Sequence, residues 1–428
     1  MPPKRKNRSA SVTDVTDLAG EPDELTKRLK AEVTKDASAA ADAETELVAR
    51  AIRNPVSPPG SRTDNKFYAR FIRMGQGDCI ALKTPGGKMI LVDCGTIDPD
   101  GMSSANRLAF AYDSLFIDRF LKQDQHIDIL ILTHPDKDHI NKLREVLTYG
   151  GQTITIGSFY HSFDLTKYQA GPRNFVTQVL QDDAREYRVV HNEDPKVPES
   201  EVSLDYRLPT ASKYERNRLT TASTDPKEVN CLDGQGGIRI VAETGGVGCT
   251  VTLLAGTVVE NYDSDNDPGN NRGSVVTLVK VGDKVLLLCG DATRSTEKYL
   301  YEKGKYAKQI KPRLEKVHVV QVGHHGSART SSGEEFLELV NPRERAVISA
   351  GKTGRKEHHL PSKEVVELYQ EQFGTPPART ADAHPISCWW PGDDAAPKDF
   401  AVSVPIYATG SDISATSDES HLDITWPA

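Results

Sequence analysis

The sequence predicts an α/β fold of the αββα type, in which two β-sheets pack face to face and helices cover their outer sides. Strand-like apolar runs are dense from about residue 67 to residue 160, and a second dense set begins at residue 237. Helical patterns stand between the runs, and two sheets sandwiched by helices account for this alternation. At 428 residues, the chain is long enough to bury a substantial core.

The first half supplies the first set of elements. Strands are expected over 68–74, 79–84, 88–93, 127–132 and 153–160, with a Pro-Gly-Gly turn before the third. Helical spacing predicts one helix over 106–121 and a second that begins at 141 and runs to 147.

The second half of the chain shows the same alternation of strand and helix patterns. Strands are expected over 237–242, 250–255, 274–281, 284–288, 317–322 and 346–350, and helices over 295–303, 333–340 and 362–373. We therefore place one large domain at 67–391. The polar stretch 162–236, with few apolar repeats, is interpreted as an insertion into that domain, and 392–428 as a C-terminal extension.

Residues 1–66 form a predicted N-terminal extension, partly helical and partly disordered. Residues 2–8 are basic and contain proline, residues 21–53 are rich in Ala, Glu, Leu and Lys, and residues 55–61 have the composition of a linker. The extension is a candidate site for a protein partner. The short basic run could also touch a phosphate-rich partner, although a solvated tail fits its composition better.

Composition restricts the functional classes. The formal net charge of −8 does not favour nucleic acid across the whole surface, although a local basic patch remains compatible with it. The six cysteines have no CxxC spacing, which favours buried, reduced thiols. No run of about 18 apolar residues and no secretory h-region stand in the sequence, so we expect no membrane partner and a cytoplasmic location.

The segment from Thr133 to His139 contains the most informative pattern. Two His and two Asp lie within six positions, immediately after the apolar run 127–132. Imidazole and carboxylate together suit divalent cations such as zinc, manganese or iron. The alternative is a polar loop that is rich in these residues for no chemical reason.

Further ligand-type residues follow other predicted strands. Asp93, Asp291 and the pair His324-His325 each come directly after a strand, and residues 351–362 contain His358 and His359. Loops at strand ends can assemble one site from distant parts of the sequence.

The order HxxxDH, then GDA, then HHGS resembles the metallo-β-lactamase superfamily, and most closely the hydrolase domain of ComEC-type DNA-uptake proteins. The motifs that carry the resemblance lie at 75–79, 91–95, 133–139, 271–276, 288–292, 322–327, 348–351, 359–362 and 379–382. The resemblance covers about 67–390, interrupted by the polar stretch, and it implies the same αββα fold.

The resemblance also implies a site for two divalent metal ions, Zn or Mn, with Mg as a further candidate. The implied metal ligands are His134 and Asp136 for one ion, Asp138 and His139 for the other, Asp291 as a bridge, and His324 or His325 or both to complete the second ion. Asp93 would orient a ligand from outside.

Two departures from the superfamily affect the first ion. Many members have His where this chain has Asp136, and the carboxylate favours manganese or magnesium over zinc. The usual His between HxxxDH and GDA is not evident, since the region of Asn271 occupies that place. His161 is a candidate replacement, with an ordinary surface histidine as the alternative reading.

The implied reaction is attack by a metal-bound hydroxide, with Asp138, His359 and Asp93 as catalytic residues. Ser327, Lys352, Arg355 and Asn271 are the candidates for binding substrate. A phosphodiesterase or nuclease acting on nucleic acid or a small phosphodiester is the leading hypothesis. The alternatives are a hydrolase of small esters, phosphocholine-type esters or lactones, and a non-enzymatic scaffold for a protein partner.

Overall fold

The structure, a computed structural model, describes residues 64–96, 126–143, 155–163, 167–168, 184–189, 236–264, 267, 269–351, 359–373, 384–392, 396–402, 405–410 and 421–427. The chain divides into two compact units, Met1–Arg53 and Asn54–Ala428, and every described residue belongs to the second. The predicted N-terminal extension up to residue 63, the helix over 106–121 and most of the insertion lie outside the described residues.

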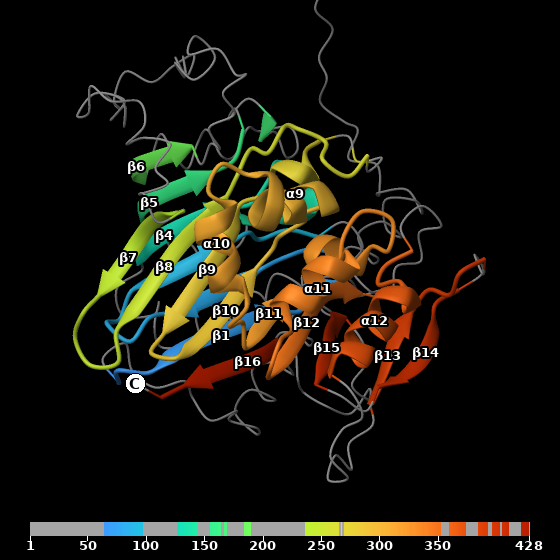
Figure 1. Cartoon of the computed structure of the whole chain (residues 1–428). Coiled ribbons are helices and arrows are strands. Elements are labelled where there is room, and N and C mark those ends of the chain that lie inside the picture. Colours follow the sequence, from blue (N-terminus) through green and yellow to red (C-terminus); the bar gives the residue numbers. More distant parts are fainter. Residues whose placement is uncertain are drawn as a thin grey trace, which may run out of the picture. The chain divides into compact units, whose positions relative to one another are not determined.

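The first sheet has seven strands in the order β16-β1-β2-β3-β4-β5-β6 (Figure 1). They are β1 Phe67–Ile72, β2 Ile80–Lys83, β3 Met89–Val92, β4 His126–Leu132, β5 Thr155–His161, β6 Ala184–Val189 and β16 His421–Trp426. The pairs from β16 to β3 are antiparallel, and those from β3 to β6 are parallel.

The second sheet also has seven strands, in the order β15-β12-β11-β10-β9-β8-β7. They are β7 Ile238–Glu243, β8 Cys249–Ala255, β9 Val276–Val281, β10 Lys284–Leu288, β11 Val319–Gln321, β12 Arg345–Gly351 and β15 Ile406–Gly410. Antiparallel pairing from β7 to β10 changes to parallel pairing from β10 to β15. A separate antiparallel pair joins β13 His384–Cys388 to β14 Lys398–Val402.

The two sheets bury their facing sides against one another. β3 is buried at every position, as expected for the apolar run MILV in the middle of a sheet. One apolar cluster contains Ile90 and Ile131 from the first sheet together with Val279 and Leu286 from the second. This cluster is the core between the sheets, and its burial holds the two halves of the site together.

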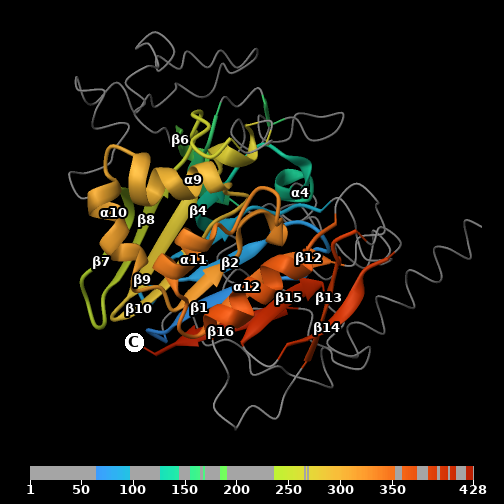
Figure 2. The ribbon, with the colours of Figure 1, turned by 45° about the vertical axis from the view of Figure 1, so that its right-hand side comes forward.

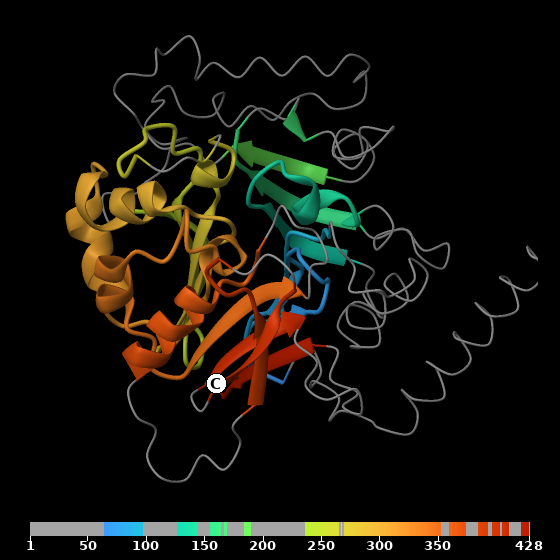
Figure 3. The same ribbon diagram turned by 90° about the vertical axis from the view of Figure 1, so that its right-hand side faces the viewer.

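Helices cover the outer face of the second sheet (Figure 2). They are α9 Arg294–Lys298, the π-helical turn η4 Tyr299–Lys303, α10 Ala307–Leu314, α11 Glu334–Val340 and α12 Lys363–Phe373. A second apolar cluster joins Leu287 and Ile348 of the sheet to Leu300, Leu314 and Val366 of the helices. In Figure 3 the yellow-to-orange helices lie on one side and the blue and green strands of the first sheet on the other. The αββα prediction is confirmed.

Short helical turns carry several chemically active residues. α4 Lys137–Ile140 contains part of the His- and Asp-rich segment, and the 3-10 turns η3 Asn271–Gly273 and η5 Gly323–Gly326 contain two further motifs. Among the helices that the structure describes, none has the length and apolar character that crossing a bilayer requires.

Two segments outside the predicted core contribute to the sheets. β6 lies within the predicted insertion and pairs with β5, while β15 and β16 lie within the predicted C-terminal extension and extend one sheet each. The predicted strands before residue 351 correspond to β1–β5 and β7–β12 within a few residues.

Candidate metal centre

Four loops meet at one edge of the two sheets. Because β3 and β4 run parallel, the loops that follow them, with Asp93 and with the segment after Leu132, leave the first sheet on the same side. β10 and β11 are parallel as well, so the loops with Asp291 and with the two adjacent histidines leave the second sheet together. Distant parts of the sequence therefore form one site.

Two glycines allow the loops of the first sheet to pack backbone against backbone. A Cβ at Gly95 would lie 2.4 Å from the carbonyl carbon of Asp138, and one at Gly77 would lie 2.2 Å from the carbonyl oxygen of Gly95. The backbone N–H of Asp78 donates to the carbonyl of Asp138 (3.1 Å). The motif at 75–79 thus holds the backbone of the His- and Asp-rich loop in place.

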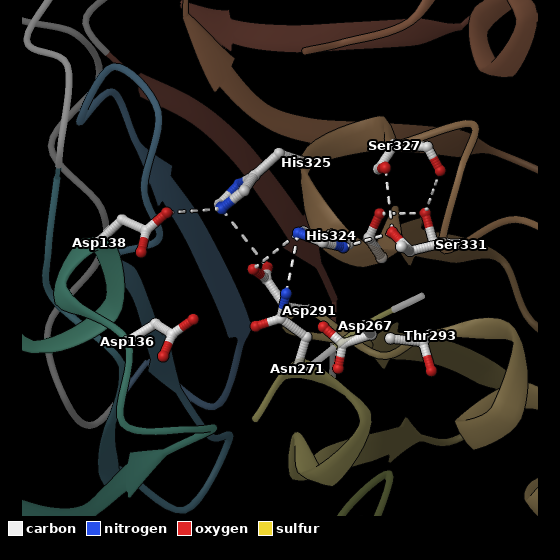
Figure 4. Close-up of polar contacts among 12 residues, drawn as sticks. Asp136, Asp138, Asp267, Asn271, Asp291, Thr293, His324, His325, Ser327 and Ser331 are labelled. Carbon is white, nitrogen blue, oxygen red and sulfur yellow. Dashed lines mark hydrogen bonds and ion pairs between the residues drawn. The ribbon is translucent and has the colours of Figure 1, made fainter. Parts of the chain in front are cut away.

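Four side chains form a compact group of candidate ligands: Asp138, His139, Asp291 and His325. His139 Nε2 lies 3.2 Å from Asp291 Oδ1. His325 Nε2 lies 3.4 Å from the same oxygen and 3.3 Å from Asp138 Oδ2, and Figure 4 shows the His325 ring between the two carboxylates. One ligand atom from each of the four lies within 4.8 Å of the others. Two imidazoles and two carboxylates at this spacing fit a divalent cation.

The buried polar atoms of this group support the fit. His139 Nε2, His325 Nε2 and Asp291 Oδ1 are buried and accept or donate no hydrogen bond within the described part of the chain. Polar atoms in that state each cost roughly 1–3 kcal/mol unless something binds them. A cation among them would remove that cost.

Groups outside the cluster direct the imidazoles inward. His139 Nδ1 donates to Asp93 Oδ2 (2.7 Å), which also accepts from the hydroxyl of Thr133 (2.5 Å). His325 Nδ1 donates to the carbonyl oxygen of Ser349 (2.6 Å). Each ring thereby carries its proton on Nδ1 and leaves Nε2 free to act as a ligand.

The backbone around the site adopts uncommon conformations. Asp93, His324 and His325 have φ of 53°, 45° and 53°, in the left-handed region. For residues other than glycine this costs on the order of 1–3 kcal/mol each, and such strain is concentrated at functional sites.

Electrostatic coupling matches a site built for a cation. Burial disfavours the Asp138 carboxylate, but the ion pair with His325 (3.3 Å) and the charge of His139 outweigh it and lower the pKa of Asp138 to about 2. Burial likewise opposes charge on His325, yet Asp291 and Asp138 raise its pKa to about 9. Without a cation, protonated imidazoles would therefore balance the carboxylates, a role that a bound cation takes over.

A second set of candidate ligands, His134, Asp136 and one oxygen of Asp291, lies beside the first. We call it the more open group, because the Asp136 side chain is 37% exposed. His134 Nε2 lies 3.6 Å from Asp291 Oδ2 and 3.8 Å from Asp136 Oδ2. Burial lowers the pKa of His134 to about 3, so the ring is neutral and its buried Nε2 can bind a metal. His134 and Asp136 are not part of the compact group of Asp138, His139, Asp291 and His325.

The two oxygens of Asp291 face different partners. Oδ1 lies near His139 and His325, and Oδ2 lies near His134 (3.6 Å) and His324 (3.8 Å). The Asp291 carboxylate thus faces both the compact group and His134.

The two adjacent histidines have different surroundings. His325 belongs to the compact group, whereas His324 Nδ1 hydrogen-bonds Thr330 Oγ1 (2.5 Å) and His324 Nε2 hydrogen-bonds Asn271 Nδ2 (3.0 Å). Thr330 Oγ1 in turn donates to Ser327 Oγ (3.0 Å). The two predicted substrate-binding residues Ser327 and Asn271 are thus joined through His324.

Other predicted residues lie in different positions. His161 is fully buried and stacks on Phe159 (ring centroids 5.1 Å apart), so the alternative of a surface histidine is wrong. It is not part of the compact group either. His359 stacks on Trp389 (4.3 Å). Lys352 and Arg355 lie outside the described residues.

Sequence reasoning missed Gln321, which ties the two sheets together at the site. Its Oε1 accepts from the backbone N–H groups of Cys289 and Gly290 (both 2.7 Å), and its Nε2 donates to Asp78 Oδ2 (3.2 Å). A single polar residue in the apolar run VVQV was the available signal. Burial raises the pKa of Asp78 to about 6.

Comparison with known proteins gives one local sequence match. No family model matches the chain. ComE operon protein 3 of Bacillus subtilis (strain 168) is 35% identical over 105 residues, which are 24% of this chain and 12% of that protein. The match thus spans about an eighth of the length of the relative.

Solved structures with a similar arrangement are distant in sequence. The metallo-beta-lactamase fold protein YhfI from Bacillus subtilis is 11% identical, with a TM-score of 0.36, and the alignment covers 72% of this chain and 93% of that one. The short form of human tRNase Z is also 11% identical, with a TM-score of 0.30, and the alignment covers 66% and 91%. The order of the strands in two mixed sheets and the helices on the second sheet show an αββα sandwich, the fold that the resemblance of the sequence motifs to the metallo-β-lactamase superfamily implies.

Proposed function

We propose that this protein is a metal-dependent hydrolase, and specifically a two-metal phosphodiesterase or nuclease. The compact group of Asp138, His139, Asp291 and His325 carries this proposal, since its buried atoms His139 Nε2, His325 Nε2 and Asp291 Oδ1 lack a hydrogen-bond partner among the described residues. The local similarity to ComE operon protein 3 and the motif order add support.

The residues divide into two ligand sets. Asp138, His139 and His325 would hold one cation, His134 and Asp136 the other, and Asp291 would bridge them. Two bound divalent cations would lower the pKa of water and neutralise the charge that develops on a phosphoryl oxygen.

Residues around the ligands would position the substrate and the ligands themselves. Asp93 fixes the orientation of His139, which makes it a positioning residue. Ser327 and the unplaced Lys352 and Arg355 stay candidates for binding phosphate, and His359 a candidate for proton transfer. The carboxylate of Asp136 favours Mn²⁺ or Mg²⁺ over Zn²⁺ in the more open group.

The test is hydrolysis by the full chain after removal of metal. Single-stranded DNA, double-stranded DNA, RNA and bis(p-nitrophenyl) phosphate are offered with Mn²⁺, Mg²⁺ or Zn²⁺. Asp138→Ala and Asp291→Ala should lower turnover by more than the ~10–100-fold typical of residues outside the ligand shell. Asp128→Asn is a matched control, because Asp128 Oδ2 accepts a hydrogen bond from the backbone of Met89 in the same sheet.

The substrates separate the hypotheses. Metal-dependent cleavage of the polymers would support a nuclease, and cleavage of the small diester alone a small-molecule phosphodiesterase. A carbonyl ester, p-nitrophenyl acetate, is offered as well, and its hydrolysis without cleavage of any phosphodiester would replace the proposal with that alternative. Turnover in Asp138→Ala equal to that of the control would remove the two-metal mechanism. A cytoplasmic location and a protein partner for residues 1–66 stay predictions, which cell fractionation and co-purification test.

A further inference from the structure

The more open group at His134 lacks a ligand. It offers one imidazole, the carboxylate of Asp136 and one oxygen of Asp291, whereas divalent cations in proteins take four or more ligands. His161, the replacement that the sequence suggested, is buried at the end of β5, where its ring lies 5.1 Å from Phe159 and 5.6 Å from Tyr168 and its Nδ1 donates to the carbonyl of Ser162 (3.0 Å).

Asn271 lies next to this gap. It begins the turn η3 and is 7% exposed. Its neighbour Asn270 donates from Nδ2 to Asp136 Oδ1 (2.9 Å), which brings the turn against one candidate ligand. Asn271 Nδ2 lies 3.0 Å from His324 Nε2, which in turn lies 3.8 Å from Asp291 Oδ2, so the turn is connected to Asp136 through Asn270 and to Asp291 through His324.

The hydrogen-bond chain determines which way the amide faces. The hydroxyl of Thr330 donates to Ser327 Oγ (3.0 Å), so Thr330 Oγ1 accepts the proton on His324 Nδ1 (2.5 Å). His324 Nε2 then carries no proton in the neutral ring and accepts from Asn271 Nδ2. The carbonyl oxygen of Asn271 is the atom left over.

That oxygen has no partner within the described residues. Asn271 Oδ1 is buried and receives no hydrogen bond there. In Figure 4 the amide nitrogen points to His324 and the oxygen lies on the side of Asp136. A buried amide oxygen without a partner costs roughly 1–3 kcal/mol, which a cation at this position would offset.

We propose that Asn271 Oδ1 is a ligand of the metal held by His134, Asp136 and Asp291, in the place of the missing histidine. The sequence analysis assigned Asn271 to substrate binding, and the geometry points to the metal instead. The inference rests on the metal centre of the proposed function and specifies its chemistry. One nitrogen and three oxygen donors make this position harder than the compact group, which has two nitrogens, so the two positions differ in metal preference and Mn²⁺ or Mg²⁺ suits this one.

Binding of Mn²⁺ to the full chain tests the proposal independently of catalysis. Metal-stripped protein is titrated with Mn²⁺, and the free ion is followed by its electron paramagnetic resonance signal. The wild type should bind two ions per chain. Asn271→Ala should keep one with unchanged affinity and bind the other at least ~10-fold more weakly, whereas Asn271→Asp should bind both.

Asn261→Ala is the matched control, since Asn261 Oδ1 accepts from the hydroxyl of Ser295 instead of facing the ligands, and it should bind both ions like the wild type. Circular dichroism of each variant verifies folding. Two ions bound by Asn271→Ala with wild-type affinity would overturn the proposal, as would a wild type that binds fewer than two or loss of one ion in Asn271→Asp. Absent hydrolysis with the expected binding pattern would overturn the proposed function alone.

Discussion

Replacing Asp93 with asparagine tests how the metal centre is oriented. The Asp93 carboxylate accepts three hydrogen bonds: Oδ2 from His139 Nδ1 (2.7 Å) and from the Thr133 hydroxyl (2.5 Å), and Oδ1 from the Thr133 backbone N–H (2.8 Å). Asparagine has one acceptor oxygen and one NH₂ group, so it cannot satisfy both sides.

Either orientation of the new amide harms the site. With its NH₂ toward the Thr133 backbone, two donors face one another. With its NH₂ toward His139, the imidazole proton moves to Nε2, and that atom can no longer bind a metal. A lost hydrogen bond to a charged group is worth about 1.5–3 kcal/mol. Since 1.4 kcal/mol is tenfold in affinity, metal binding by Asp93→Asn should weaken by ~10–100-fold.

Calorimetric titration of the metal-stripped full chain with Zn²⁺ or Mn²⁺ measures this loss. Asp128→Asn makes the same chemical change on the first sheet, where Asp128 Oδ2 accepts a hydrogen bond from the backbone N–H of Met89 (2.8 Å), and it should leave metal affinity unchanged. Equal affinity in the two variants would refute the role given to Asp93.

Three more predictions concern folding. Gly95→Ala should destabilise the fold by about 1–3 kcal/mol, because its Cβ would lie 2.4 Å from the carbonyl carbon of Asp138; thermal unfolding at the wild-type temperature would contradict this. Burial raises the pKa of Glu297 from 4.5 to about 7, so its contribution to stability is present at low pH and is lost as the pH rises from 4.5 to 7. In denaturant unfolding, the free energy of unfolding of the wild type should therefore fall by about 3 kcal/mol relative to that of Glu297→Gln over this range. A constant difference between the two would mean that the backbone N–H donors of Ser332 and Gly333 keep the carboxylate ionised. Trp426→Ala should lower the free energy of unfolding by about 3–5 kcal/mol, because the buried indole stacks on Phe67 with ring centroids 5.3 Å apart. A shift of the urea midpoint no larger than that of Trp390→Ala, a change at an exposed tryptophan, would contradict this.

Local patterns predicted most of the fold because the strands of the inner layers are apolar over their whole length. β3 (MILV) and β10 (KVLLL) are of this kind. β6 (AREYRV) and β14 (KDFAV) each contain adjacent charged residues, and no local pattern shows that they find partners in a sheet. β15 and β16 were also missed, because their partner strands, β12 and β1, lie far away in the sequence.

The candidate site was predictable in its ligand types and less so in its details. The His and Asp content of the loop after β4 was enough to predict metal ligands there. No local pattern indicates that His325 joins the compact group while His324 hydrogen-bonds Thr330 and Asn271. That difference depends on two consecutive residues in the left-handed region, a conformation set by the surrounding packing.

The pairing of β1 with β16 has a consequence for synthesis of the chain. The ion pair between Arg70 and Asp423 in these strands joins residues 353 positions apart. At about 5–20 residues per second, a ribosome needs roughly 20–70 s to make the second strand after the first. Throughout that interval β1 has β2 on one side and an unpaired edge on the other, which is the kind of edge that other chains can join. A chaperone or a low growth temperature would therefore most improve the yield of folded protein during the interval before the last strand emerges.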